Sequence, residues 1–513
     1  MPVFVGCDLG TMGSKAAVVG DDGTILGAAL EEVSLHRPRA GWVEQDPLEI
    51  EASAHRVIRR ALDESGERGE IAGIAFSGQM SGIGTIGTGF EPVTHYDSWL
   101  DTRCEPYIDR MAEWAGRVVE LSGCPPTYSH GPKMLWWRHE RPDAYAQIER
   151  FVPIGSFVAA RLAGLQVADA FMDRTYLHFT NLADTASGRW SDELIALFEV
   201  DPARLPRLVE PVDVIGEVTA EASSASGLPR GTPIAAGAGD TAASALGAAV
   251  VRPGQAFDAA GTASVFGICV DGFRPDTAAH TLMATRGVAP GTFVNLAFIN
   301  GGGLALRWFR DEIASDLASD PDAYATLDAL AASVPPGSEG LLWFPHFQGR
   351  VLPPQPHARG SWVGLTSRHT RGHLFRSLLE GIAFEYAGWA RLAAEAGSGD
   401  LRETRAIGGG AASALWNQIK ADVLGIDWIP VVTQECGVLG DAIIAAAATG
   451  HVRDVASAAD SWQRAGPAVR PDAERHAIYD RLRGAYRALG EALTPVFRAM
   501  VDAPRGASVE ERS

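Results

Sequence analysis

Two aspartates in this sequence stand beside glycine-rich turns, a setting suited to phosphate chemistry. Asp8 closes an apolar run and precedes Gly-Thr, in the stretch DLGTMGSK. Asp240 follows Gly-Ala-Gly and precedes a segment of small residues, in GAGDTAASALG. A carboxylate in such a place can accept a proton from an attacking hydroxyl group or hold a hard cation such as Mg²⁺. For Asp240 taken alone, the competing interpretation is the N-cap of the helix that follows, which would lower the pKa of the carboxylate.

The first of these turns contains the residues of a phosphate loop without the spacing of the Walker motif. That motif requires GxxxxGK[ST] on a turn from a strand to a helix, whereas Lys15 is followed by Ala-Ala-Val-Val, which indicates a strand. A glycine-rich hairpin can still direct several backbone N–H groups at one anion, and Thr11 and Ser14 add hydroxyl donors. Taken alone, the segment is also compatible with an ordinary glycine-bearing hairpin.

A similar arrangement returns in the middle of the chain. GQAFDAAGTASVFGICV, residues 254–270, again has a strand, Gly-Thr, a small residue and a second strand. The match is in arrangement more than in letters, and it indicates two related halves that meet near residues 248–254. Two such turns facing each other, with Gly261 and Thr262 on the second, would clamp a polyphosphate.

The elements that must position these residues alternate between strand-like and helix-like segments, which indicates an α/β protein. Four segments are expected to be strands: 3–7, 16–19, 24–29 and 71–77. DDG at 21–23 marks a hairpin turn, and Asp46-Pro47 predicts a helix to about residue 64 with Asp46 as its N-cap. Residues 102–235 are expected to be mostly helical, and a helical end is expected to reach about residue 500.

Composition restricts the classes of partner. The 44 basic and 63 acidic residues leave a net charge of -19, which argues against a nucleic-acid or anionic-membrane surface. The five cysteines are far apart and form no CxxC pattern, so a disulfide framework is not expected and a cytoplasmic location is. The N-terminus lacks the pattern of a signal peptide, and the low-charge stretches are too short to span a bilayer.

Six motifs, taken together and in this order, resemble the FGGY family of carbohydrate kinases, within the sugar kinase–actin–heat-shock ATPase superfamily, and xylulokinase-like members most of all. The motifs are DLGTMGSK, GPKMLWW, GAGDTAASALG, AAGTAS, GSWVGLTSRHTRGHLFRSLLEG and GGGAASALWNQIKADVLG. The resemblance covers residues 3–495 and implies two ribonuclease H-like (actin-like ATPase) domains with a central cleft. It implies a sugar-binding domain with the first phosphate loop at 1–248 and an ATP-binding domain at 249–500, and 501–513 is expected to be a disordered tail.

The resemblance also assigns catalytic and ATP-binding roles. Asp240 would be the general base that takes the proton from the sugar hydroxyl attacking the γ-phosphate of ATP. A weak base suffices because the transition state of phosphoryl transfer is loose. Asp8, together with Asp240, would hold Mg²⁺, mostly through water. The residues expected at ATP are Thr11, Ser14, Lys15, Gly261, Thr262, Gly303, Arg307, Gly409, Gly410, Ser413 and Asn417.

For the sugar, the resemblance implicates the segments SGQMSG and SWLDTR. The residues expected there are Gln79, Met80, Ser81, Trp99, Asp101 and Arg103, with Asp240. Trp99 would offer an apolar face to the carbon chain, Asp101 would accept from hydroxyl groups and Arg103 would brace them.

Two positions depart from the xylulokinase pattern. Xylulokinases usually show GQMHG where this chain has Ser81, and GGDN where Asp240 is followed by Thr241. The substrate is therefore open among the sugars and polyols of the family, which include ribulose, erythritol, glycerol, fuculose and gluconate. D-Xylulose is the leading expectation.

A second class remains as an alternative: a non-catalytic ATP-binding protein of the actin or chaperone type, which would share the paired Gly-Thr hairpins. Asp240 and the two sugar segments argue against it. The expected partner is a small sugar or polyol, with no nucleic acid and no membrane, and a homodimer is expected only by resemblance. Because the phosphate site is divided between the halves, neither half is expected to turn over ATP well alone.

Overall fold

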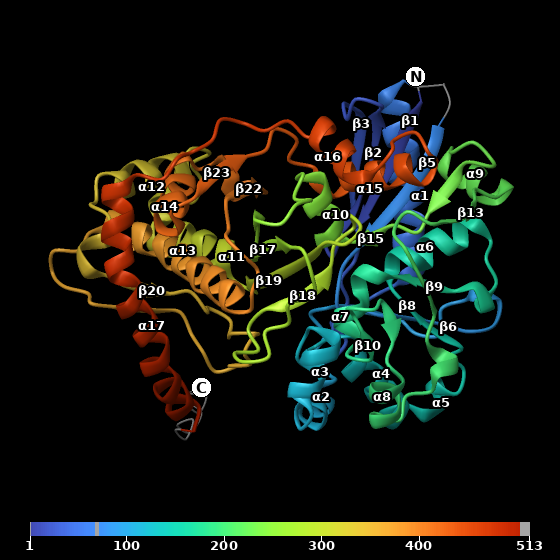
Figure 1. The fold of residues 1–513 in the computed structure, drawn as a ribbon, viewed down its shortest axis with the longest axis horizontal. Coiled ribbons are helices and arrows are strands. Elements are labelled where there is room, and N and C mark those ends of the chain that lie inside the picture. Colours follow the sequence, from blue (N-terminus) through green and yellow to red (C-terminus); the bar gives the residue numbers. More distant parts are fainter. Residues whose placement is uncertain (1, 67–70, 503–513) are drawn as a thin grey trace, which may run out of the picture.

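A computed structural model describes residues 2–66 and 71–502, which form two bodies, each built around a β-sheet (Figure 1). The first sheet has the order β13-β14-β5-β1-β2-β3, with β15 also pairing with β5. Its strands are β1 (Val3–Leu9), β2 (Gly13–Gly20), β3 (Ile25–Glu32), β5 (Ile71–Gly78), β13 (Val214–Glu217), β14 (Pro233–Ala235) and β15 (Ala238–Gly239). This mixed α/β architecture with two sheet-containing domains confirms the predicted fold class.

The second sheet has the order β18-β19-β17-β16-β22-β23. Its strands are β16 (Gln255–Ala260), β17 (Ser264–Val270), β18 (Met283–Arg286), β19 (Phe293–Ile299), β22 (Glu403–Ile407) and β23 (Asp427–Pro430). In each sheet the first strand of a hairpin pairs antiparallel with the second and parallel with a later strand: β1 with β2 and β5, and β16 with β17 and β22. The expectation of two related halves is therefore confirmed at the level of strand pairing.

Local signals account for the elements around the first turn. Val3–Leu9 is almost wholly buried because helices cover both faces of the sheet. One is α1 (Pro47–Ser65), where the Asp46 side chain accepts from the Leu48 N–H at 2.9 Å, as its predicted N-cap role requires. The α-helices between 102 and 235 are α2 (Glu105–Ala112), α3 (Ala115–Ser122), α4 (His130–Glu140), α5 (Pro142–Tyr145), α6 (Ile154–Ala163), α7 (Leu177–Thr180), α8 (Asp192–Leu197) and α9 (Ala220–Ser226). They cover fewer than half of these residues, because short strands and loops lie between them, so the expectation of a mostly helical segment is met only in part.

The other face of the first sheet is covered by the far end of the chain. Helices α15 (Cys436–Ala448) and α16 (Val455–Trp462) lie beside β1, β2 and β5 in Figure 1. A Cβ added at Gly6 would lie 2.0 Å from the carbonyl oxygen of Val438, so only glycine allows α15 to approach β1 this closely. Residues 436–462 thus contribute to the first body, and the domain boundary near residue 248 stays a prediction.

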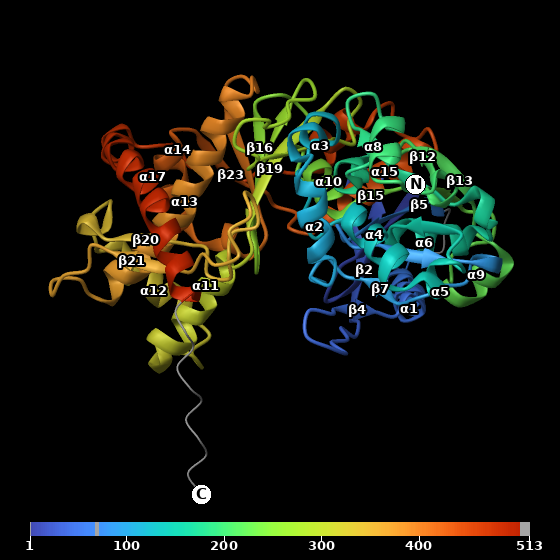
Figure 2. The ribbon, with the colours of Figure 1, turned by 90° about the horizontal axis from the view of Figure 1, so that it is seen from below.

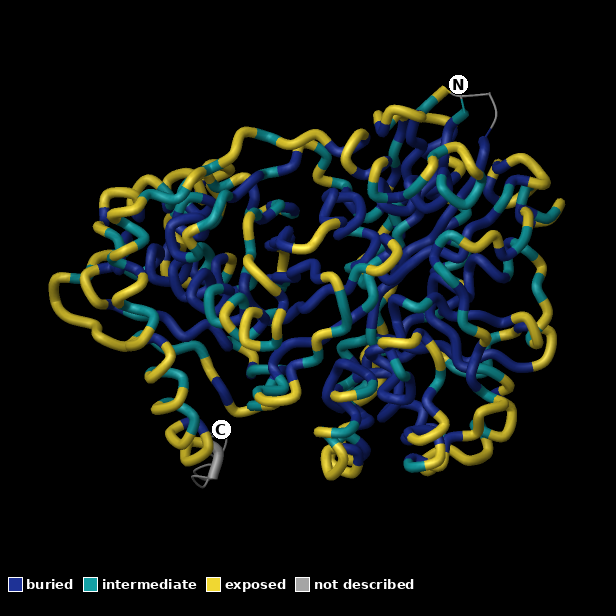
Figure 3. The backbone as a smooth tube through the Cα atoms, viewed as in Figure 1, coloured by how far each residue is buried: buried dark blue, intermediate teal, exposed yellow. Residues whose placement is uncertain are grey.

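The second body carries its helices on the side seen at the left of Figure 2. They include α13 (Arg371–Glu395), α14 (Ala414–Leu424) and α17 (Ala473–Asp502). The end of α17 agrees with the expected helical end, and the remainder of the expected disordered tail lies outside the described residues. Figure 3 shows the buried residues in the interior of both bodies and the exposed residues mainly on their outer loops.

At that junction β18 packs on the first body. The Thr285 hydroxyl donates to the Thr175 carbonyl at 3.0 Å, and Arg286 Nη1 donates to the Thr185 carbonyl at 3.1 Å. Apolar side chains of both bodies, among them Met172 and Phe257, share one buried cluster. Within the described ranges, no helix combines the length and the apolar character needed to cross a membrane.

Candidate active site

Asp240 is the first residue of α10 (Asp240–Gly247), directly after β15, whose Gly239 pairs with Gly78 at the end of β5. Its Oδ1 accepts from the backbone N–H of Thr241 and, at 3.0 Å, from the Thr241 hydroxyl. Gly239 holds the N-cap position, so the capping role considered for Asp240 is wrong. Across the described residues both hydrogen bonds fall on Oδ1, and Oδ2 accepts none.

The electrostatic setting of Asp240 favours a base. Burial, with a smaller contribution from the negative charge of Asp8, raises the pKa of Asp240 to about 7. The hydrogen bonds from Thr241 act in the opposite direction but are outweighed. The lowered pKa expected of a helix cap is therefore not found, and the carboxylate changes its charge near neutral pH, where a general base works best.

Asp8 lies near the end of β1 and is linked to a carboxylate from the far end of the chain. The Ser77 hydroxyl donates to Asp441 Oδ2 at 2.8 Å and lies 3.3 Å from Asp8 Oδ1. Burial raises the pKa of Asp8, with Lys15 opposing, and burial followed by the charge of Asp8 raises the pKa of Asp441 well above its usual range. Asp8, Asp240 and Asp441 thus form one electrostatically coupled group.

Asp441 lies outside the six motifs and is not predicted as a site residue. Its signal in the sequence is a single charge in the otherwise uncharged helix segment GVLGDAIIAAAATG. A lone aspartate in such a helix must be buried, and buried carboxylates are seldom retained without a partner or a role.

The first turn contacts residues assigned to the sugar. Thr11 Oγ1 accepts from Trp99 Nε1 at 2.8 Å, and the Thr11 carbonyl accepts from Gln45 Nε2 at 3.1 Å. Gln79 Nε2 in turn donates to Gln45 Oε1 at 2.7 Å. The structure therefore brings Thr11, Trp99 and Gln79 together, and it adds Gln45, which lies in a segment, GWVEQDP, that the sequence suggests is structural.

Lys15 and Ser14 differ in what they can reach. Lys15 forms an ion pair with Glu435, the residue immediately before α15. The lysine is therefore held where β2 meets the start of α15. Ser14 Oγ is buried, and none of the described residues offers it a hydrogen-bond partner. Their roles toward phosphate remain predictions.

Gln79, Met80 and Ser81 follow β5 and approach the catalytic turn. A Cβ added at Gly239 would lie 2.7 Å from Met80 Cε, so the thioether packs directly against the residue before Asp240. Gln79 Oε1 is buried and, among the residues described, accepts no hydrogen bond. Ser81 adopts a left-handed conformation with φ of 61°, and its carbonyl accepts from Lys133 Nζ at 3.0 Å.

Asp101 and Arg103 are engaged with each other. Arg103 Nε lies 2.9 Å from both carboxylate oxygens of Asp101, which also accepts from the Val43 N–H at 2.7 Å. The guanidinium group stacks over Trp42 at 3.7 Å from the ring centroid, and the pair is buried. In this conformation the pair braces its own loop, and its proposed contact with sugar hydroxyls stays a prediction.

The glycines assigned to ATP divide into two kinds. A Cβ at Gly303 would lie 1.9 Å from the Gly261 carbonyl oxygen, and one at Gly410 would lie 2.5 Å from Ala260 Cβ. These two glycines let neighbouring segments pack against the exposed turn of Gly261 and Thr262. At Gly409 an added Cβ would meet no described atom within 4 Å, so this position faces open space.

Ser413 and Asn417 make contacts within the second body. Ser413 is the N-cap of α14, where its hydroxyl accepts from the Trp416 N–H at 3.0 Å and donates to Asp328 at 2.7 Å. Asn417 is buried and donates to the Ala411 carbonyl at 2.8 Å. Arg307, on α11 (Gly302–Trp308), is exposed. Contact of these three with adenosine remains predicted.

The oxygen ligands offered by Asp8, Asp240 and Asp441 are of the kind that binds Mg²⁺. Carboxylate oxygens are the hard ligands that Mg²⁺ prefers. No set of three or more ligating side chains among the described residues is arranged to hold a metal directly.

Comparison with known proteins gives matches along most of the chain. The N-terminal domain profile of the FGGY family of carbohydrate kinases matches residues 3–247, and the C-terminal domain profile matches residues 258–449. The glycerol kinase of Aromatoleum aromaticum is 31% identical over 515 residues, covering 96% of this chain and 99% of that protein. The gluconokinase of Bacillus subtilis is 26% identical over 460 residues, 88% of each chain. The crystal structure of xylulose kinase from Rhodospirillum rubrum has a TM-score of 0.88 at 28% identity, covering 96% of this chain and 99% of that one.

Proposed function

Because this chain belongs to the FGGY family of carbohydrate kinases, which are ATP-dependent, we propose that it phosphorylates a ketose or polyol. D-Xylulose, giving D-xylulose 5-phosphate, is the leading substrate. The observation that carries the proposal is Asp240, a partly buried carboxylate with a pKa of about 7 next to the sugar segment at Met80.

The chemistry assigned to this chain's residues is positioning and proton transfer. Asp240 accepts the proton of the substrate hydroxyl as that oxygen attacks the γ-phosphate. Gln79 Oε1, buried with no hydrogen-bond donor among the described residues, is available to a second hydroxyl. The apolar face of Trp99, fixed through Thr11, contacts the carbon chain.

The nucleotide and the cation are assigned to the two turns. The backbone at Gly10–Lys15 and the exposed turn of Gly261 and Thr262 would hold the phosphates, and Asp8 with Asp240 would hold Mg²⁺. The cation would neutralise charge on the transferred phosphoryl group. The open space at Gly409 supports placing adenosine against the second body.

Selection among substrates is assigned to Ser81 and Thr241. Serine in place of histidine leaves a smaller polar group, and relatives of similar identity are named for xylulose, gluconate and glycerol. The Thr241 hydroxyl donates a hydrogen bond to Asp240. The residue at position 241 therefore affects both the charge of Asp240 and the specificity of the site.

A substrate panel at fixed ATP and Mg²⁺ tests the proposal. ADP release is measured with D-xylulose, D-ribulose, erythritol, glycerol, L-fuculose and D-gluconate, and the highest kcat/KM identifies the acceptor. The variant Asp240→Asn is the control: it should bind ATP and unfold as the wild type does, with kcat lower by roughly 10²–10⁴-fold. Near-normal turnover in that variant would exclude Asp240 as the base.

The same panel separates the two classes of function. If no sugar or polyol stimulates ATP hydrolysis although Mg·ATP binds, the protein is a conformational ATP-binding protein and the kinase proposal fails. We further propose that the enzyme is a cytoplasmic homodimer, on the resemblance alone. Light scattering coupled to size-exclusion chromatography tests the dimer, and a monomeric mass contradicts it.

A further inference from the structure

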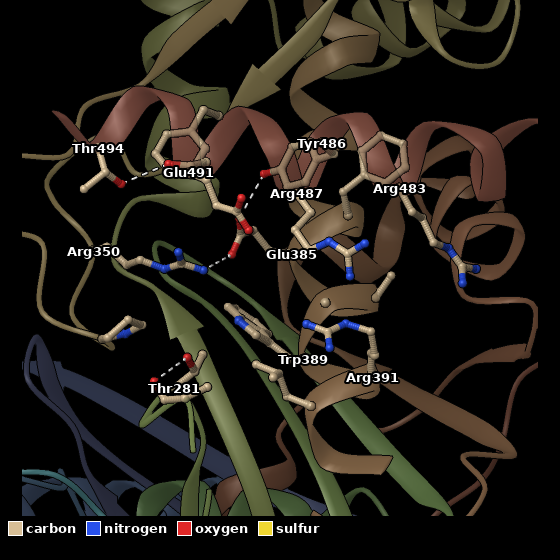
Figure 4. Close-up of a pocket in the computed structure, with 18 of the residues that line it drawn as sticks. Thr281, Arg350, Glu385, Trp389, Arg391, Arg483, Tyr486, Arg487, Glu491 and Thr494 are labelled. Atoms are coloured by element: carbon tan, nitrogen blue, oxygen red, sulfur yellow. Dashed lines mark hydrogen bonds and ion pairs between the residues drawn. The ribbon is translucent and has the colours of Figure 1, made fainter. Parts of the chain in front are cut away.

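The second body contains a cavity that the proposed function does not use. It has a volume of about 450 Å³ and lies between α13, α17 and the segment around Arg350 (Figure 4). This volume falls within the range of roughly 300–1,000 Å³ that is usual for small-molecule sites. None of the residues assigned to sugar, ATP or Mg²⁺ lines it.

The cavity is cationic on a strongly acidic protein. Four arginines line it, Arg350, Arg391, Arg483 and Arg487, against two glutamates, Glu385 and Glu491. The chain as a whole has a net charge of -19, so a local excess of two positive charges is a departure that needs a cause. Clustered arginines in a recess are the usual means by which proteins bind phosphate or carboxylate groups.

The charge of Glu385 is already compensated within the wall. Its carboxylate accepts from Arg350 Nη2 at 3.0 Å and from the Tyr486 hydroxyl at 3.0 Å, as the dashed lines of Figure 4 show. It also lies 3.4 Å from His346 Nε2. Glu385 therefore compensates Arg350. Of the other arginines, Arg391 pairs with Glu395 and Arg483 with Asp480, so only Arg487 lacks an acidic partner among the described residues.

Several donors in the wall are unused. Arg350 Nε and Trp389 Nε1 are buried without an acceptor in the described part of the chain, and Trp389 is 3% exposed. Arg487 is exposed at the mouth of the cavity and forms neither a hydrogen bond nor an ion pair with any residue that the structure describes. A buried donor without an acceptor destabilises the fold, and a ligand with acceptor oxygens would satisfy the Arg350 and Trp389 donors.

We propose that this cavity binds a small organic anion, through a phosphate or carboxylate group held by Arg487, Arg350 and Trp389 Nε1. The body of the ligand lies against the apolar part of the wall, which Phe344, Phe384 and Leu392 form with the Trp389 ring. A ring or short hydrocarbon therefore suits it better than a fully hydroxylated sugar.

The site is connected to the phosphate turn through α13. Glu385 faces the cavity, and the next residue, Tyr386, donates to Asp258 Oδ1 at 2.7 Å. Asp258 lies in β16, which leads to Gly261 and Thr262, and it is also paired with Lys420 of α14. The binding site thus lies on the back of a helix whose other face supports the second phosphate turn.

Calorimetric titration of the full chain with phenyl phosphate, benzoate and benzyl alcohol tests the proposal. Saturable binding of one equivalent of phenyl phosphate, benzoate or both is expected, with no binding of neutral benzyl alcohol, and the tighter of the two anions identifies the acid group. Arg487→Gln should weaken binding about tenfold or more, since a charge-assisted hydrogen bond is lost.

Arg481→Gln provides a matched control, because Arg481 is exposed on the same helix and does not line the cavity. Its affinity should equal that of the wild type. Equal binding by the wild type and both variants would place the anion elsewhere, and absence of saturable binding by either anion would also overturn the proposal. Phosphoryl transfer takes no part in this titration, so its outcome is independent of the proposed kinase reaction.

Discussion

Asp240 is held at the border between its charged and neutral forms, and the pH dependence of the reaction should report this. With a pKa of about 7, the carboxylate is mostly protonated below neutral pH and cannot accept a proton there. We predict that kcat/KM rises about tenfold per pH unit below 7 and levels off above it. Initial rates at subsaturating sugar across the neutral range measure this profile.

The variant Asp240→Asn controls that experiment, because its residual activity should lack the rising limb. A flat profile in the wild type, or an identical limb in the variant, would mean that another group titrates. The raised pKa also links the stability of the protein to pH. At pH values between the pKa of Asp240 in the unfolded chain and about 7, folding is accompanied by uptake of a proton at Asp240. The contribution of Asp240 to the free energy of unfolding therefore decreases as the pH rises through this interval.

Burial and the charge of Asp8 raise the pKa of Asp441 well above the usual range, which favours the neutral form of this carboxyl group. Asparagine is close in shape and hydrogen-bonding capacity to a protonated carboxyl group. We predict that Asp441→Asn keeps a kcat close to that of the wild type. Asp441→Ala, which removes the closer of the two acceptors of the Ser77 hydroxyl, should unfold with a free energy lower by roughly 1–3 kcal/mol and should turn over more slowly.

Steady-state kinetics and urea unfolding of the two variants decide the role of this residue. If Asp441 worked as an ionised metal ligand, asparagine would be as damaging as alanine. Loss of activity in both variants to the same extent would therefore refute the neutral form of Asp441.

At the scale of elements, the crossing of α10 and α15 determines where Asp240 stands. A Cβ at Gly440 would lie 2.0 Å from the Ala243 carbonyl oxygen, and one at Gly247 would lie 2.0 Å from that of Cys436. We predict that Gly440→Ala separates the helices, lowers the free energy of unfolding by roughly 1–3 kcal/mol and reduces kcat by displacing α10.

Gly116→Ala is the matched substitution, since the added methyl group meets no described atom within 4 Å in α3 (Ala115–Ser122). It should leave kcat unchanged and stability equal or higher. Chemical denaturation and turnover of both proteins test the prediction, and a Gly440→Ala protein that matches the wild type in both would contradict it.

Elements determined by residues close together in the sequence could be predicted, and contacts between distant segments could not. The hairpins β1–β2 and β16–β17 and the start of α1 are determined by turn residues, apolar runs and the Asp46 cap, which lie within a few residues of the structure they specify. The contact of Lys15 with Glu435 crosses 420 positions, and no pattern in either segment indicates the other. The short strands between 102 and 235 have too few residues to show a period.

The site residues follow the same rule. Asp8 and Asp240 could be found because each stands in a characteristic glycine-rich motif. Gln45 and Asp441 were missed because their roles arise only when distant segments meet, through Gln79 and Ser77 respectively.

At the scale of the molecule, the first sheet is covered on one face by α15, which follows the second sheet in the sequence. Apolar residues of its sheet, such as Phe4 and Val19, are buried by Leu439 and Ile443 of α15. We predict that residues 1–248 expressed alone aggregate or unfold without cooperativity. The same fragment joined through a flexible linker to residues 430–466 should be monomeric and unfold in one transition.

A fusion in which Leu439 and Ile443 are replaced by aspartate is the control and should behave like the bare fragment. Scattering and thermal unfolding of the three proteins give the answer. Cooperative unfolding of the bare fragment as a monomer would show that α15 is dispensable to the first body.

Because α15 is translated long after the strands that it covers, synthesis on the ribosome is also affected. About 190 residues separate the end of α10 from α15, which takes roughly 10–40 s to translate at about 5–20 residues per second. During that interval the nascent first sheet presents an uncovered apolar face. The nascent chain is therefore expected to depend on chaperones. Codon changes that slow translation after residue 248 should lower the yield of active protein.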